Sequence, residues 1–300
     1  PLFHIHLNVD YPFNLTGILY FPKISNDLNL QKDRIQLYQN QVFVTDNVEG
    51  IVPEFLGLLK GVIDSPDIPL NVSRSYLQSD ASVKKITNYI TRKVADKLNS
   101  IFKNERENLE SKWNDIKVVI EYGMLTEDKF YDKAESFNLY PTVDDKYFTY
   151  EELEKKIKKL QTDKDGNLII LYAQNKDEQY TYIESAKEKG YEVLLLDSPI
   201  IPHLMQKLES KKEKIKFSRV DSDTLENLIK KDEEVISKLT DEEKEKLKPM
   251  IETAVENEKY TVQLEALDSN SMPFMLAQPE FMRRMKAVSY THLRAHETCT

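Results

Sequence analysis

The chain has 300 residues, of which 40% are hydrophobic, so its length is sufficient for about two domains with buried cores. Its 42 basic and 51 acidic side chains give a net charge of −9, which disfavours a protein that binds nucleic-acid backbones. The sequence contains no apolar run long enough to span a membrane and does not begin with the pattern of a signal peptide. Its single cysteine, Cys299, excludes an intramolecular disulfide and fits a reducing cytoplasm.

The N-terminal part of the chain has the pattern of a sheet followed by a long helix. Apolar residues alternate from Phe3 to Val9, and β-forming residues recur at 17–21 and 41–45, which predicts an antiparallel or mixed sheet. Apolar residues at helical spacing then predict one amphipathic helix from Ala81 to about Leu109. We therefore expect a large α/β unit over residues 1–110.

The strand pattern begins directly after Pro1, without an initiator methionine. We interpret this start as a cut and not as a natural terminus.

The second half of the chain predicts a smaller α/β unit. After a small helical connector over 111–160, strands and helices alternate over 161–222, which indicates a parallel sheet with right-handed crossovers. Gly190 is expected to end the first helix of this unit. The residues expected in its buried strands are Leu168, Ile170, Val193 and Leu195.

A polar, charged stretch follows this unit, and Thr240 has the pattern of a helix N-cap. We assign residues 223–287 to a partial third domain. The predicted fold class is thus α/β (α+β), with two sandwich-like units, a connector and a partial α+β domain.

Several classes of enzyme are disfavoured by the missing motifs. The first strand-to-helix connection of the second unit, residues 173–181, contains no glycine, and no G-x-G-x-x-G or Walker A loop occurs in the chain. This argues against a dinucleotide enzyme and a small-molecule transferase. A G-x-S-x-G motif is also missing. His4 and His6 alternate on a predicted strand, but two ligands without a third predict no metal site.

The last residues of the chain have the spacing of zinc ligands. His292, His296 and Cys299 have helical ligand spacing. However, residues 289–300, SYTHLRAHETCT, resemble a translated adaptor sequence, so we treat 288–300 as a non-native tail and exclude it from the fold.

The strongest local signal is a stiff loop that carries an arginine. In residues 61–78, GVIDSPDIPLNVSRSYLQ, Pro66 and Pro69 forbid a continuous helix, while Asn71 and Ser73 are turn and capping residues. Arg74 would project from this loop, and its planar guanidinium suits recognition of phosphate or carboxylate.

The segment 52–78, VPEFLGLLKGVIDSPDIPLNVSRSYLQ, is similar to the middle domain of the heat-shock protein 90 family, whose core reads D-L-P-L-N-x-S-R-E-x-L-Q. Further agreement lies at 1–22, 37–46, 187–208 and 272–285, in the family's order. The last of these segments, MPFMLAQPEFMRRM, looks most like the bacterial members, the HtpG chaperones.

The resemblance implies specific roles for residues of the loop. Arg74 matches the arginine that reaches the ATP γ-phosphate, Asn71 and Gln78 match its catalytic-loop neighbours, and Phe43 matches an apolar contact for the nucleotide-binding domain. The chain departs from the family at Ser75, where most members have Glu. It also departs at 40–41, Asn-Gln, where a partly or wholly basic pair is usual.

The resemblance also implies the activity of the parent protein, an ATP-dependent chaperone of the stress response that binds unfolded clients in the cytoplasm and forms a homodimer. ATP and Mg²⁺ would be bound mainly by an N-terminal domain that these residues do not include, so we expect no ATP hydrolysis from this chain alone. The alternative is a non-catalytic α/β scaffold for protein–protein interactions, which has no reason to stiffen a loop around Arg74.

A methionine-rich segment near the end is the candidate client site. Met272, Met275, Met282 and Met285 fall within it, and thioether side chains adapt to varied partners. Pro279 is placed to begin a helix on which Phe281, Met282 and Met285 share one face. The alternative is that this face is buried in a C-terminal core or dimer bundle.

Overall fold

The computed structural model describes residues 2–21, 35–46, 48, 50–57, 59–68, 80–231, 239–255, 261–266, 274–279 and 282. The chain divides into two compact units, one of residues 1–156 and 195–213 and the other of residues 157–194 and 214–300. Both contain helices and a β-sheet, so the predicted mixed α/β class is confirmed.

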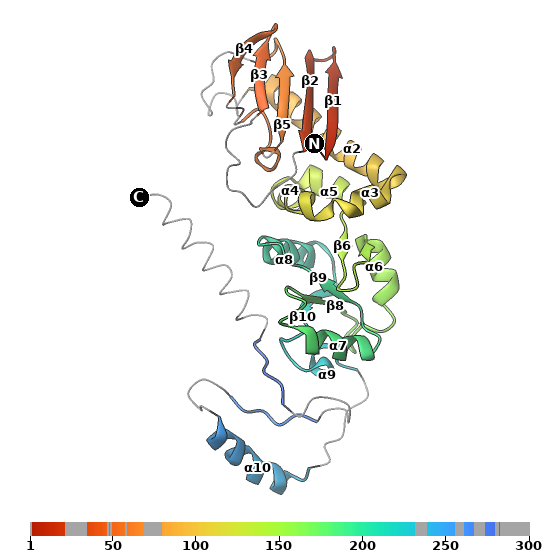
Figure 1. Cartoon of the computed structure of the whole chain (residues 1–300), viewed down its shortest axis with the longest axis vertical. Helices are drawn as coiled ribbons and strands as arrows, with labels where there is room; N and C mark the ends of the chain where they lie inside the picture. Colours follow the sequence, from red (N-terminus) through yellow and green to blue (C-terminus); the bar gives the residue numbers. More distant parts are fainter. Residues whose placement is uncertain are drawn as a thin grey trace, which may run out of the picture. The chain divides into compact units, whose positions relative to one another are not determined.

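The first unit is built on a mixed five-stranded sheet (Figure 1). The strand order is β1-β2-β5-β3-β4, in which β3 and β5 are parallel and the other neighbours are antiparallel. The strands are β1 Phe3–Val9, β2 Leu15–Phe21, β3 Ile35–Gln39, β4 Val42–Thr45 and β5 Lys60–Asp64. The prediction of an antiparallel or mixed sheet is therefore correct.

One face of this sheet is apolar because the side chains alternate along each strand. The register places Ile5 opposite Leu19, Leu19 opposite Gly61, and Gly61 opposite Ile35, so these residues form one row across four strands. Gly61 has a φ of +143°, and a Cβ there would collide with the carbonyl oxygen of Ile18. Only glycine therefore fits this position of the row.

Helix α2 (Ala81–Asn104) covers one face of the sheet and lies behind the strands in Figure 1. Its buried residues recur every three or four positions and include Val83, Ile86, Ile90 and Val94. The predicted single helix to Leu109 is wrong at its end. Glu105 leaves the helical conformation, with φ −142° and ψ 46°, and a separate helix, α3 (Arg106–Ser111), follows.

The rest of the first unit is mostly helical. Helix α4 (Trp113–Thr126) packs against the 3₁₀ helix η1 (Glu54–Leu56), α5 (Asp128–Ala134) and α8 (Ile201–Lys211). A two-stranded ribbon of β6 (Tyr140–Pro141) and β7 (Tyr147–Phe148) precedes α6 (Tyr150–Ile157). The region predicted as a helical connector thus contains a short ribbon as well.

The second unit contains a three-stranded sheet in the order β10-β8-β9, with β8 parallel to β10. Its strands are β8 Leu168–Ala173, β9 Val193–Leu195 and β10 Ile215–Arg219, and its first helices are α7 Tyr180–Glu188 and α9 Leu225–Leu228. All six residues of β8 are buried, as expected for a central strand.

The predicted core position at Leu195 is wrong, because this side chain is only partly buried whereas Leu194 and Leu196 are buried. Burial along β9 therefore does not alternate, because the consecutive residues Val193 and Leu194 are both buried. Leu168, Ile170 and Val193 are buried as predicted.

Two helix ends predicted from single residues, at Gly190 and Thr240, are confirmed. Gly190 follows α7 with a φ of +76°, and its N–H donates to Lys187 O at 2.8 Å. Thr240 caps α10 (Asp241–Ala254) in a reciprocal capping box with Glu243.

Candidate functional site

The loop residues predicted to act in catalysis, Asn71, Arg74 and Gln78, lie outside the described residues, as does Ser75. The structure describes the backbone on both sides of this loop, namely residues 59–68 before it and Asp80 after it. The described parts of the site are therefore the two anchors of the loop.

The first anchor joins the end of β5 to the turn between β1 and β2. Ser65 is fully buried, and its Oγ donates to Asn14 O at 2.6 Å. In return, Asn14 N donates to Asp67 Oδ2 at 2.6 Å. The N–H of Ser65 also donates to Tyr38 O at 3.1 Å, which extends the pairing of β5 with β3 by one residue. Residues 65–67 are therefore fixed on two sides.

The second set of bonds comes from the hairpin of β3 and β4. Gln39 Nε2 lies within hydrogen-bond distance of two consecutive loop carbonyls, Pro66 O at 3.1 Å and Ile68 O at 3.3 Å. Gln41 N donates to Asp64 Oδ2 at 2.7 Å. Because Ile68 is also buried, the chain enters the loop from a position fixed by polar and apolar contacts.

The turn between β3 and β4 has an unusual backbone conformation that a hydrogen bond to β5 stabilises. Asn40 and Gln41 both have positive φ, 50° and 66°, as a two-residue turn of the I′ type requires. Asn adopts this conformation readily, whereas a Gln there is strained. The bond from Gln41 N to Asp64 offsets that strain, so the pair that departs from the family's basic residues has a structural role.

Phe43 lies on this hairpin as an exposed aromatic side chain. It follows the turn on β4, is 53% exposed, and packs edge-on against Tyr38 with ring centroids 5.7 Å apart. Tyr38 is paired with Phe43 on one side and with Asp64 on the other. The structure thus places the predicted contact residue two strands from the beginning of the loop, with its ring available to a partner.

The other end of the loop is fixed by the start of α2. Asp80 is extended, and its Oδ1 accepts from Ser82 N at 2.8 Å and from Val83 N at 3.0 Å. Free N–H groups at a helix start attract anions, but here the carboxylate of Asp80 occupies two of them. The start of α2 therefore offers fewer free backbone donors to an anion.

Sequence reasoning singled out the arginine but missed the residues that anchor its loop. Asn14, Gln39, Ser65 and Asp67 act through contacts with residues distant in sequence, which no local spacing reveals. The available signal was the Ser-Pro-Asp run at 65–67, because these residues favour turns with side-chain bonds to the backbone.

The glycine-free connection of the second unit is closed by its own side chains. Gln179 Oε1 accepts from Gln174 N at 2.8 Å and from Asn175 N at 3.1 Å. Asn175 Oδ1 accepts in turn from the N–H groups of Asp177 and Glu178. The backbone donors that would surround a phosphate in a nucleotide-binding loop are thus already used.

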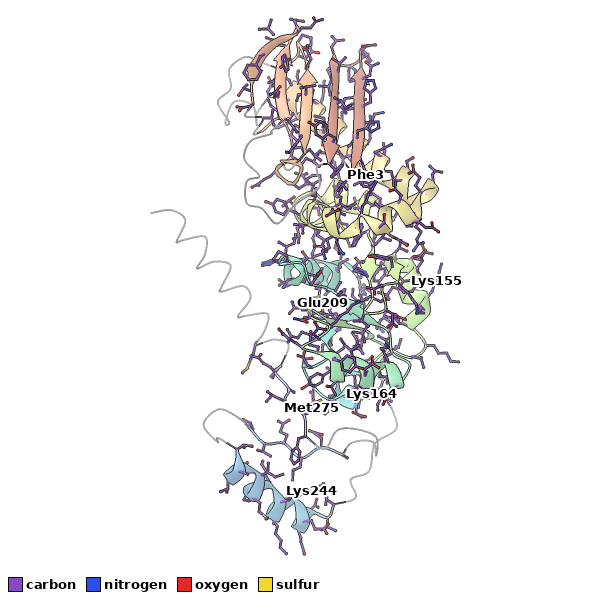
Figure 2. The ribbon with its side chains drawn as sticks, viewed as in Figure 1. Phe3, Lys155, Lys164, Glu209, Lys244 and Met275 are labelled. Carbon is purple, nitrogen blue, oxygen red and sulfur yellow. The ribbon has the colours of Figure 1, made fainter. Side chains whose placement is uncertain are left out.

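The remaining candidates are described only in part. In the methionine-rich segment, Met282 is 58% exposed, and Phe281 and Met285 lie outside the described residues. Phe274 and Leu276 are also exposed, and the nearby Met275 is labelled in Figure 2. His292, His296 and Cys299 are likewise outside.

His4 and His6 lie on the exposed face of β1. Among the residues that the structure describes, no three His, Cys, Asp or Glu side chains gather closely enough to hold a metal ion. No described helix combines the length and the apolar character needed to cross a membrane.

Comparison with known proteins agrees with the resemblance of the loop. The family model described as "Hsp90 protein" matches residues 1–289. The chaperone protein HtpG of Bacteroides thetaiotaomicron is 56% identical over 292 residues, which is 96% of this chain and 43% of the relative. That of Porphyromonas gingivalis is 55% identical over 289 residues, 95% of this chain and 42% of the relative.

A more distant relative, the chaperone protein HtpG of Myxococcus xanthus, is 30% identical over 206 residues, which is 67% of this chain and 31% of the relative. The chain spans about 43% of the length of the most similar of these relatives. With a family model that matches nearly all of its residues, the chain belongs to the Hsp90 family, in its HtpG group.

Proposed function

We propose that this chain supplies the middle region and the first part of the C-terminal region of an ATP-dependent molecular chaperone. In this proposal Arg74 reaches the γ-phosphate of ATP, which is bound with Mg²⁺ mainly by an N-terminal domain. Membership of the Hsp90 family supports the proposal, and the relatives are named as chaperones.

The observation that carries the proposal is the anchorage of the loop at both ends. Ser65 and Asp67 are bonded to Asn14, Gln39 bonds two carbonyls at the loop's entrance, and Asp80 caps the helix at its exit. An arginine on a loop with fixed ends loses less conformational freedom on binding a phosphate than an arginine on a loop with free ends. This anchorage suits a group that contributes to a site completed by another domain, and in the proposal Asn71 and Gln78 would assist Arg74.

The other parts of the proposal follow the same comparison. Phe43 would contact the nucleotide-binding domain, and its exposed ring on a fixed hairpin is suited to this role. Unfolded clients would bind the methionine-rich segment, and the whole protein would act as a homodimer in the cytoplasm. The division of residues 1–287 into a large unit, a connector, a second unit and a partial C-terminal domain remains our interpretation.

The competing function is a non-catalytic scaffold that binds other proteins through exposed surfaces such as the hairpin of Val42 and Phe43. If the chain were only such a scaffold, loss of Arg74 would not change the ATP turnover of a protein that contains the chain together with an ATP-binding domain. The two functions are therefore separated by one side chain.

The test uses the chain alone and a chimaera in which it replaces the matching region of the Bacteroides thetaiotaomicron relative. The chain alone should show no magnesium-dependent ATP hydrolysis above background. In the chimaera, Arg74→Ala should lower kcat by at least about tenfold, since arginines acting on a γ-phosphate contribute up to about 10³ to 10⁵ in rate. Nucleotide affinity should change little, because the other domain holds the nucleotide.

Arg92→Ala, at an exposed position of α2, is the matched control and should leave kcat unchanged. Turnover by the pure chain would refute the assignment of the nucleotide site to another domain. A kcat within about twofold of the parent chimaera for Arg74→Ala would refute its catalytic role and favour the scaffold.

A further inference from the structure

A buried carboxylate lies where the chain before α8 meets α4. Glu121, on α4, is 6% exposed, and Ser198, three residues before α8, is 4% exposed. Ser198 Oγ lies near enough to lower the pKa of this carboxyl. Yet neither Glu121 Oε2 nor Ser198 Oγ has a hydrogen-bond partner with proper geometry. Burial of polar atoms without hydrogen-bond partners costs free energy, so this contact is less stable than a hydrogen-bonded one would be.

The cation that acts on Glu121 is itself paired with another carboxylate. Lys117, one turn earlier on α4, has its Nζ 2.5 Å from Asp197 Oδ1, in the segment that precedes α8. Lys117 lowers the pKa of Glu121 and Asp197 raises it, so the neighbouring ion pair has opposing effects. Tyr140, on β6, is a further buried titratable group that interacts with Glu121.

Other charged groups around α4 are engaged among themselves. Glu54 of η1 interacts with Tyr122, and Asp128 of α5 pairs with Lys207 and Lys211 of α8. Burial has the largest effect on the pKa of Glu121 and raises it to about 7. Ser198 and Lys117 lower this pKa, but their effects are smaller.

We infer that a proton on Glu121 controls how tightly α8 and the residues before it dock on α4. When the carboxyl is protonated, the docked state buries no charge at this position. When the carboxyl is ionised, the docked state must bury a negative charge that Lys117, which is paired with Asp197, only partly offsets, so opening of the segment becomes more favourable.

The direction of the pH dependence follows from the raised pKa. The contact is tightest below the ordinary pKa of a glutamic acid, about 4.5, and weakens as the pH rises towards 7. Above about pH 7 the docked state is itself ionised, so the weakening levels off. This inference stands independently of the proposed chaperone function.

The test is hydrogen exchange of the α8 amides in the whole chain between pH 5 and 8.5, corrected for the intrinsic pH dependence of exchange. The opening of Ile201–Lys211 should increase by about one to two orders of magnitude over this range. Glu121→Gln, which keeps the shape and cannot ionise, should remove most of this increase. Glu107→Gln, on the exposed side of α3, is the matched control and should keep it.

Two further variants keep the result interpretable. Ser198→Ala should move the midpoint to higher pH, because Ser198 lowers the pKa of Glu121. His203→Gln should leave the profile intact, which separates Glu121 from the histidine on α8. A flat profile in the parent chain, or the same profile in Glu121→Gln, would overturn the inference. So would a profile that disappears in His203→Gln.

Discussion

Ser65 shows how much one hydroxyl group contributes to the site. It is fully buried at the end of β5, where its Oγ donates to Asn14 O and accepts from Asp67 N at 3.3 Å. The same atom therefore bonds two backbone groups that belong to different turns. Without it, the entrance of the Arg74 loop would lose one of its fixed points.

Ser65→Ala should lower the free energy of unfolding by about 1–3 kcal/mol, because it removes two part-buried hydrogen bonds between the side chain and the backbone. Chemical denaturation measures this change. Ser111→Ala is the control, since that exposed serine bonds only the carbonyl of Asn108 one turn earlier. Its effect should stay within about 0.5 kcal/mol, and equal effects at the two serines would contradict the anchoring role.

At the scale of elements, strand β8 is the clearest test of the second unit. Its residues are buried throughout, and Ile170 is paired with Phe217 of the parallel strand β10. Deletion of side-chain atoms there leaves a cavity that the sheet cannot fill.

Ile170→Ala should cost about 2–5 kcal/mol of unfolding free energy, measured by denaturant titration. Glu188→Ala, on the exposed side of α7, is the control and should change it by no more than about 0.5 kcal/mol. Lys211, the last residue of α8, is unsuitable as a control. Its Nζ is 3.3 Å from Asp128 Oδ1 and 4.2 Å from the ring centre of Tyr131. A small effect at Ile170 would mean that β8 is not a core strand.

The elements also show what the sequence can predict. Period-two and helical patterns located β1, β2 and α2, because the burial of these elements follows their local periodicity. The break at Glu105 carried no such signal, since neither glycine nor proline marks it. There, Arg106 forms ion pairs with Glu152 at 2.5 Å and Glu110 at 2.8 Å, and the contact with Glu152 joins residues distant in sequence.

The same limit applies to the candidate site. Its arginine could be found from the loop sequence and its likeness to a family, whereas Gln39 and Asn14 could not. Their roles depend on a strand order, β2-β5-β3, that brings three separate segments together.

At the scale of the whole molecule, the proposed chaperone function requires a surface for unfolded proteins. Replacement of Phe281, Met282 and Met285 by Ser should weaken binding of an unfolded substrate and leave the melting temperature unchanged, if this segment is that surface. Fluorescence anisotropy of a labelled unfolded protein measures the affinity. Met250→Ser is the control, at an exposed methionine of α10. A lower melting temperature with unchanged binding would show that the segment belongs to a core.

The first unit is discontinuous in sequence, because it includes the later segment 195–213, which contains α8. On the ribosome, the N-terminal part of this unit emerges first, and the face of α4 on which α8 packs stays uncovered until residue 213 has been made. At about 5–20 residues per second, that interval after Lys156 lasts roughly 3 to 11 s. During it, the nascent protein exposes apolar surface that other chains can bind. A protein of a chaperone family would thus pass through a stage of synthesis in which it resembles a client itself.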